Sequence, residues 1–263
     1  MSGCKIRFVV IKFLALVAPA ILAQPNTHAN PVKISISLFG PPNSYYDAEG
    51  KPTGIYVDYF RELEKTTGLT FETTLLPYKR TLLHLEKGLV DATPLFHSKE
   101  RQQTFHMVAQ ITNQPVGVVA KASFPLKSRA DLQALTIGTL RGGRYDREFD
   151  HGVDLTKQPV NNYNQGIKML EIDRINAMAG ALVTIYSKLF DHKMTVGPPL
   201  LFKPKQVWIM WSRLSTLGPE YREKIRQGTA TLNKAKRFEA IQNRYVRDFS
   251  KIQRLIQAGI RVY

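Results

Sequence analysis

The chain has 263 residues, 43% of them hydrophobic, and a formal net charge of +16 at pH 7. Its only cysteine, Cys4, precedes the apolar run of a targeting segment, so we expect no disulfide, catalytic thiol or cysteine-ligated metal in the mature chain. The six histidines are scattered with no pair four residues apart, and no phosphate-cradling or nucleophile-elbow motif occurs, so neither a metal nor a cofactor is expected.

Residues 1–29 have the features of a signal peptide. A short basic start leads into an apolar run over residues 8–23, and small-residue exits follow at Ala23 and Ala29. No later apolar stretch of about 20 residues occurs, so no transmembrane span is predicted. We therefore expect cleavage after Ala23 or Ala29 and a mature protein in the periplasm.

The first half is predicted to alternate strands with helices. Apolar alternation and turn residues place strands over residues 32–38, 69–76 and 90–95, and helices over 59–69 and 79–87. Asp58 is expected to cap the first of these helices. This order favours a mostly parallel sheet wrapped by helices.

A second unit begins near Val116. Strands are predicted over residues 115–120, 135–140 and 206–212, and helices over 219–233 and 236–248 with a shorter one from Ile252. Ser128 to Asp131 has the spacing of a capping box. The segment 85–92 is echoed by 170–177, each a helix end turning into a strand, so two similar α/β lobes are the simplest account.

Two features are candidates for binding an anion. Arg101 follows the 90–95 strand in a segment that reads as strand end and loop, and its guanidinium offers paired donors that match a carboxylate. Gly142 and Gly143, flanked by Arg141 and Arg144, are predicted to expose backbone N–H groups at a strand-to-helix junction. The simpler alternatives are a surface arginine and a tight turn.

The positive charge is concentrated near the C-terminus. Residues 203–263 contribute ten of the thirteen net positive charges that remain once residues 1–29 are removed. Such a face could bind nucleic acid, anionic lipid or an acidic wall polymer. We favour solvated helix faces, because the charges alternate with apolar positions at helical spacing, and export removes the chain from nucleic acid.

Five segments in order resemble the family 3 extracellular solute-binding proteins, the periplasmic receptors of polar amino acid uptake. They lie between residues 32 and 250 and comprise the Gly50 to Asp58 motif, Leu85 to Ala92, Glu100-Arg101, Asp131 to Gly142, and Arg174 to Ala177. The resemblance implies the α/β type II periplasmic-binding fold, with two lobes joined by two crossover strands. Lobe 1 would be residues 30–112 with 204–263, and lobe 2 residues 113–203.

The resemblance also implies a function and a site. A monomer would capture a small amino-acid-like solute between the lobes and deliver it to an inner-membrane permease of an ABC transporter. Arg101 would grip a carboxylate, Thr93 and Gly143 would help it, and Tyr45 or Tyr46 would cover the ligand.

The sequence departs from the family pattern at two places. Phe96 replaces the small hydroxyl residue five positions before the arginine, and Gly180 or Ala181 stands where an acid takes the α-ammonium group. Because a buried ammonium without an acid is costly, these departures put an ordinary α-amino acid ligand in question.

Two other functions are left open by the sequence. One is a dehydratase-like enzyme on the same fold, for which Asp47, Glu49 and Asp146 are the only plausible cleft carboxylates. The other is an envelope sensor or scaffold that uses the basic C-terminal face.

Overall fold

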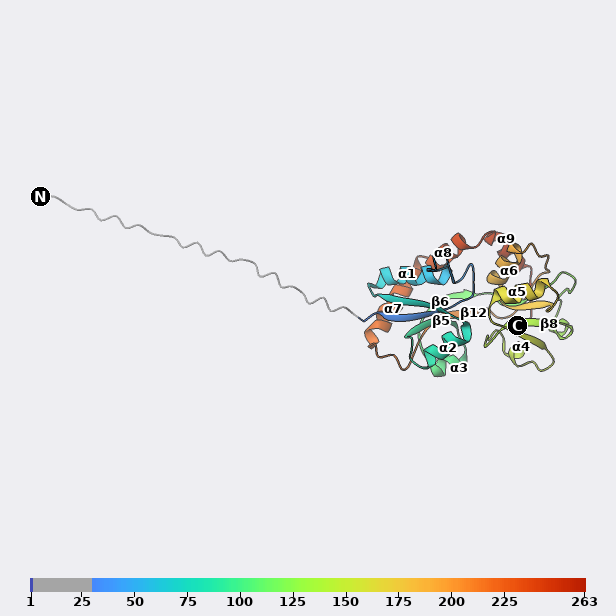
Figure 1. Cartoon of the computed structure of the whole chain (residues 1–263), viewed down its shortest axis with the longest axis horizontal. Helices are drawn as coiled ribbons and strands as arrows, with labels where there is room; N and C mark the ends of the chain where they lie inside the picture. The colour runs from blue at the N-terminus through green and yellow to red at the C-terminus, as the bar shows by residue number, and fades with distance from the viewer. Residues whose placement is uncertain (2–29) are drawn as a thin grey trace.

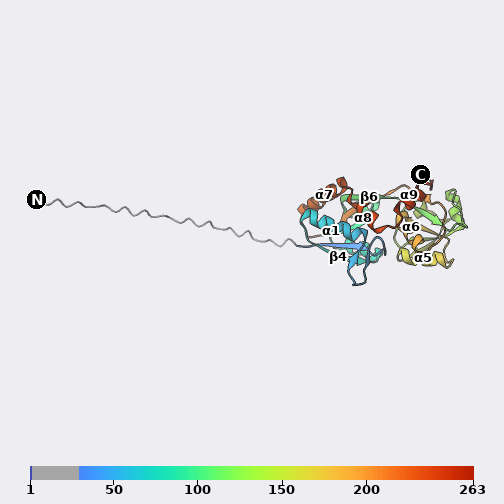
Figure 2. The same ribbon diagram turned by 90° about the horizontal axis from the view of Figure 1, so that it is seen from above.

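The computed structural model describes Met1 and residues 30–263 as two α/β lobes lying side by side (Figures 1 and 2). The proposed signal peptide, both cleavage sites and Cys4 lie in residues 2–29, outside the described residues. None of the helices in the described part is long and apolar enough to cross a membrane.

The first lobe is built on a five-stranded sheet in the order β4-β1-β5-β12-β6. Its strands are β1 (Val32–Ser37), β4 (Phe71–Leu76), β5 (Ala92–Phe96), β6 (His106–Gln114) and β12 (Lys205–Trp211). β1 runs parallel to β4 and β5, whereas β12 is antiparallel to β5 and β6. A small hairpin of β2 (Tyr45–Tyr46) and β3 (Pro52–Thr53) projects from this lobe.

Helices cover both faces of the first sheet. In Figure 1, α1 and α8 lie on one side and α2 and α3 on the other. The helices of this lobe are α1 (Ile55–Thr67), α2 (Tyr78–Glu86), α3 (Lys99–Thr104), α7 (Pro219–Lys234) and α8 (Arg237–Tyr245). The inner face of α1 is apolar at helical spacing and contributes Tyr59, Phe60 and Leu63 to the core, where each is at most 1% exposed.

The second lobe is built on a six-stranded sheet in the order β13-β11-β7-β10-β8-β9. Its strands are β7 (Val116–Ala120), β8 (Thr136–Leu140), β9 (Thr156–Val160), β10 (Ala177–Ala181), β11 (Leu200–Leu201) and β13 (Ile260–Arg261). Its helices are the 3₁₀ helix Arg129–Ala134, α4 (Arg147–His151), α5 (Tyr163–Glu171), α6 (Leu182–Asp191) and α9 (Phe249–Gln257). The predicted capping box at Ser128 and Asp131 is present.

The chain passes between the lobes three times. It crosses from β6 to β7 and from β11 back to β12, and again from α8 to α9 through residues 246–248. After this last crossing α9 packs on α6 and β13 pairs with β11. The assignment of all of residues 204–263 to the first lobe is therefore corrected for residues 249–263, because this segment packs on a helix and pairs with a strand of the second lobe.

Two local predictions also need correction. Helix α1 begins four residues earlier than expected, with Gly54 rather than Asp58 at its N-cap, and Asp58 lies in the first turn. Arg101 does not lie in a loop but in α3, whose N-terminus is capped by the Ser98 side chain. In both places the residue directly before the helix, Gly54 or Ser98, is the N-cap and so determines where the helix begins.

Candidate functional site

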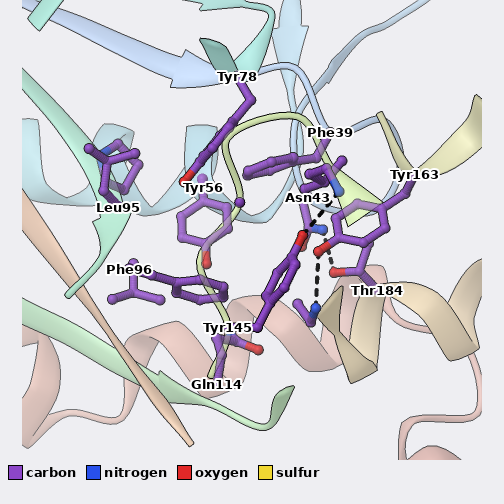
Figure 3. Close-up of a pocket in the computed structure, with 15 residues that line it drawn as sticks. Phe39, Asn43, Tyr56, Tyr78, Leu95, Phe96, Gln114, Tyr145, Tyr163 and Thr184 are labelled. Atoms are coloured by element: carbon purple, nitrogen blue, oxygen red, sulfur yellow. Dashed lines mark hydrogen bonds between the residues drawn. The ribbon is translucent and has the colours of Figure 1, made fainter. Parts of the chain in front are cut away.

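A cavity lies where the ends of the two sheets face each other (Figure 3). Its volume is about 40 Å³, room for only a few water molecules. The first lobe and the strands that leave it supply Phe39, Asn43, Tyr56, Tyr78, Pro94, Leu95, Phe96, Gln114 and Val207. The second lobe supplies Leu140, Gly143, Tyr145, Tyr163, Ala181 and Thr184. A ligand here would therefore touch both lobes.

Six of the fifteen residues that line the cavity are aromatic. The Phe39 ring lies with its centroid 5.8 Å from that of Tyr78 and 5.9 Å from that of Tyr163, so it joins the two lobes. Tyr56, Phe96 and Tyr145 complete the enclosure (Figure 3). Such a wall excludes water and favours a ligand with an apolar or aromatic body.

A turn of the first lobe holds the second lobe close. The Asn43 Nδ2 donates a buried hydrogen bond of 2.6 Å to Thr184 Oγ1 on α6. Three residues earlier, Gly40 has a φ of +81°, and a Cβ there would lie 3.0 Å from Asn164 Nδ2 and 3.2 Å from Lys188 Nζ. The positive φ favours glycine at this position, and a Cβ there would press on the ends of two side chains of the second lobe.

Three tyrosine hydroxyl oxygens of the wall accept hydrogen bonds from fixed donors. Tyr78 accepts from Arg101 Nη2 at 2.7 Å, Tyr145 from the Leu140 amide at 3.2 Å, and Tyr163 from the Ala181 amide at 3.0 Å. Burial raises the pKa of Tyr145 and of Tyr163, which keeps these hydroxyls protonated. The Tyr145 and Tyr163 hydroxyls therefore each keep a proton that they can donate to another group.

Arg101 lies directly behind this wall. Its side chain donates from Nη1 to the Phe96 carbonyl oxygen at 2.7 Å and from Nη2 to the Tyr78 hydroxyl, and the residue is 7% exposed. Its guanidinium carbon is 6.0 Å from the centroid of the Tyr78 ring. Arg101 thus contacts two residues that line the cavity without lining it itself.

The other predicted site residues are dispersed. Thr93 is fully buried in β5 beside Pro94, and its hydroxyl has no hydrogen-bond partner among the described residues. Tyr45 and Tyr46 form β2, and the Tyr46 hydroxyl donates to the Leu75 carbonyl oxygen at 3.3 Å, away from the cavity. Of the predicted set, only Gly143 lines the cavity.

The arrangement predicted around the paired glycines is wrong in one respect. Helix α4 begins only at Arg147, with Asp146 as its N-cap, so Gly142 and Gly143 form a turn rather than a helix N-terminus. The Gly143 amide donates to the Leu140 carbonyl oxygen at 2.8 Å, and the Arg141 amide donates to a strand carbonyl at 2.9 Å. The four residues from Arg141 to Arg144 line a separate hollow of about 140 Å³.

None of the carboxylates considered for catalysis lines the cavity. Asp47 accepts from the backbone amides of Glu49 and Lys51 in the exposed hairpin turn. Asp146 accepts from the Phe149 amide and lies 2.9 Å from Arg129 Nη1. Within the described residues, no group of three His, Cys, Asp or Glu side chains is placed to hold a metal ion.

Sequence reasoning missed most of the cavity residues. Tyr56, Gln114, Tyr163 and Thr184 lie in four separate segments, and each reads in sequence as an ordinary core or surface position. Ala181 was noticed only as a place where an acid is missing. The one sequence signal for the others is a polar or aromatic residue at the end of a strand or in the first turn of a helix.

Comparison with known proteins gives the same picture of the fold. The model of the bacterial extracellular solute-binding proteins, family 3, matches residues 32–248. No curated protein sequence matches significantly.

Solved structures with this fold share little sequence with the chain. A histidine kinase sensor domain with similarity to periplasmic binding proteins superposes with a TM-score of 0.72 at 18% identity, covering 83% of this chain and 97% of its own. The arginine-, lysine-, histidine-binding protein ArtJ from Geobacillus stearothermophilus has a TM-score of 0.70 at 16% identity, covering 85% and 99%. A solute receptor for L-cysteine of Neisseria gonorrhoeae has a TM-score of 0.70 at 18% identity, covering 82% and 89%.

Proposed function

The chain belongs to family 3 of the bacterial extracellular solute-binding proteins, and we propose that it captures a small polar or anionic solute reversibly in the cavity between its lobes. In this proposal the protein is exported by its signal peptide, acts as a periplasmic monomer without catalysis, and delivers the solute to the permease of an ABC-type transporter.

The main support is that both lobes build the same cavity. Side chains of the first lobe, such as Tyr56, and of the second, such as Tyr145, face one enclosed space. A solute held there gains contacts from both lobes only when they are closed, so binding and closure are coupled. The cavity volume of about 40 Å³ means that a solute larger than a few waters enters only when the lobes separate.

A library of small solutes tests this proposal. The purified mature protein is screened by thermal shift against amino acids, amines, carboxylates and neutral amides, and hits are measured by calorimetry. A single solute that raises the melting temperature and binds with 1:1 stoichiometry is the expected result. Small-angle scattering with and without the solute then measures the change in lobe separation.

A matched pair of variants places the solute. Ala181→Leu adds a side chain to the cavity wall and should abolish binding, whereas Ala48→Leu makes the same change in the exposed hairpin turn. Binding that survives Ala181→Leu in a folded protein would exclude the cavity as the site.

Signal sensing is a second candidate function. One of the similar folds is a histidine kinase sensor domain, and the chain carries its excess positive charge in the C-terminal segment. Co-purification with a transporter permease from cross-linked cells supports delivery, whereas co-purification with a membrane histidine kinase supports sensing.

A further inference from the structure

Two buried polar side chains in the cavity lack partners. Tyr56 is 8% exposed and Gln114 is 6% exposed, and both line the cavity. Among the described residues, neither the Tyr56 hydroxyl nor the Gln114 carboxamide forms a hydrogen bond, whereas their neighbours Asn43 and Thr184 bond each other. In Figure 3 the Tyr56 hydroxyl points toward the space between Phe96 and Tyr145.

These groups indicate what a ligand must supply. Burial raises the pKa of Tyr56, so its hydroxyl remains a donor. The Gln114 amide offers both a donor and an acceptor. The polar atoms of both side chains are accessible at the cavity surface, so a ligand that accepts from Tyr56 and Gln114 meets two donors that no described residue occupies.

Two buried cations lie just outside the cavity, one in each lobe. Arg101 donates to the carbonyl oxygen of Phe96 and to the hydroxyl of Tyr78. Lys188 is 4% exposed, and its Nζ donates to the side-chain oxygen of Asn164. Neither cation forms a salt bridge with any described acidic residue.

Lys188 is close to the cavity because of helical spacing. It follows Thr184 by four residues on α6, so the two side chains lie on the same face, and Thr184 lines the cavity. Its Nζ also lies against Gly40, next to the wall residue Phe39. Positive potential therefore reaches the cavity from both sides.

This charge distribution discriminates between ligand classes. No aspartate or glutamate lines the cavity, so the ammonium group of an amine or α-amino acid would be buried without an acid partner. An aromatic wall alone could attract a cation, but the Tyr78 ring already faces the Arg101 guanidinium, and the positive potential of the two buried cations opposes a cation at the other rings. A carboxylate, in contrast, accepts from hydroxyl and amide donors and is stabilised by the two cations that lie just outside the cavity wall.

We infer that the cavity, once movement of the lobes has widened it beyond the about 40 Å³ of this structure, selects a small aromatic monocarboxylate without an ammonium group, with its carboxylate held by Tyr56 and Gln114 and its ring against the aromatic wall. Arg101 and Lys188 act as positioning residues that supply charge through the groups they contact. This inference rests on the proposed function and names the solute class for the same site.

Four matched probes test the inference by calorimetry at pH 7. Phenylacetate should bind at least tenfold more tightly than phenylacetamide, which lacks the charge, and than L-phenylglycine, which adds only an α-ammonium. Benzylamine should not bind. Equal affinity for phenylacetamide, tighter binding of L-phenylglycine, or binding of benzylamine each overturns the inference.

The solute library separates this inference from the proposed function. If none of the four probes binds while another solute binds and is excluded by Ala181→Leu, the solute class is wrong and the proposed function stands. If no member of the library binds, both are refuted.

Variants then test the assigned residues. Tyr56→Phe should weaken phenylacetate binding about tenfold, while Tyr59→Phe, the same change on the core side of α1, should leave it unchanged. Lys188→Met should reduce the preference for phenylacetate over phenylacetamide at least threefold, and the exposed control Lys224→Met should not. A preference unchanged in both Lys188→Met and Arg101→Met would overturn the role of the buried cations, since a purely structural residue alters both affinities together.

Discussion

Replacing Lys188 by methionine should raise the free energy of unfolding at pH 7, although it removes a hydrogen bond. Burial lowers the pKa of Lys188 from 10.5 to about 8, and the nearby Asp191 only partly opposes this. At about 1.36 kcal/mol for each pH unit, keeping the ammonium charged in the folded protein at pH 7 costs about 3 kcal/mol. Methionine has a similar length and no charge, and losing the bond to Asn164 costs about 1 kcal/mol. The expected gain is about 2 kcal/mol.

The effect should depend on pH in a defined direction. Between about pH 8 and 10.5 the unfolded lysine still binds a proton that the folded one has lost, so wild-type stability rises with pH in this window. The advantage of Lys188→Met should therefore shrink and vanish by about pH 10.5. Urea unfolding of both proteins at pH 7 and pH 10 measures it, with Lys224→Met as the exposed control. A variant that is less stable than the wild type at pH 7, or a difference that does not change with pH, would refute the reasoning.

Three further outcomes are expected. Arg101→Ala should lower the free energy of unfolding without ligand by about 1–3 kcal/mol, because two buried hydrogen bonds are lost, and Arg101→Lys should restore only part of it; denaturant titration measures both. Arg237 lowers the pKa of Glu62 by a bidentate hydrogen bond. Arg237→Gln should therefore lower the free energy of unfolding at pH 7 but not at a pH well below the 4.5 of a free glutamate, where Glu62 is protonated. Urea unfolding midpoints of both proteins at pH 7 and pH 3 check this. Replacing Lys234 and Lys236 together by glutamine should change solute affinity by calorimetry less than about threefold, because both lie on exposed helix ends far from the cavity; a larger loss would place the ligand elsewhere.

Local sequence patterns predicted the strands and helices well where the apolar residues follow a single periodicity, that of a strand or that of a helix. The alternation around Ile34 and Ile36 corresponds to β1, and both halves of the repeated segment are helix ends followed by strands, as expected. The predictions failed where a single turn residue decides the outcome. Ser98 caps a helix that begins at Lys99 and contains Arg101, and Gly142 belongs to a turn whose helix begins five residues later.

The site was much less predictable than the fold. The family resemblance pointed to Arg101, but the residues that enclose the cavity come from both lobes and from sequence positions as distant as Phe39 and Val207. Their proximity depends on how the two lobes face each other, and no local periodicity encodes that. That no described residue forms a hydrogen bond with the Tyr56 hydroxyl or the Gln114 carboxamide depends on the positions of donors and acceptors in both lobes, which the sequence alone does not give.

The passage of the chain from α8 to α9 acts as a tether beside the hinge. The β6–β7 and β11–β12 connections lie together, since β12 pairs with β6 and β11 with β7 at their ends, whereas the passage from α8 to α9 crosses along another side of the molecule (Figure 1). Three residues, even fully extended, span only about 10 Å. A wide separation of the lobes on that side would require α9 to lose its packing on α6, or the end of α8 or the start of α9 to unfold. The lobes should therefore separate mainly by twisting relative to each other. Because residues 246–248 limit their separation, the opening for solute exchange should be smaller than the β6–β7 and β11–β12 connections alone would permit.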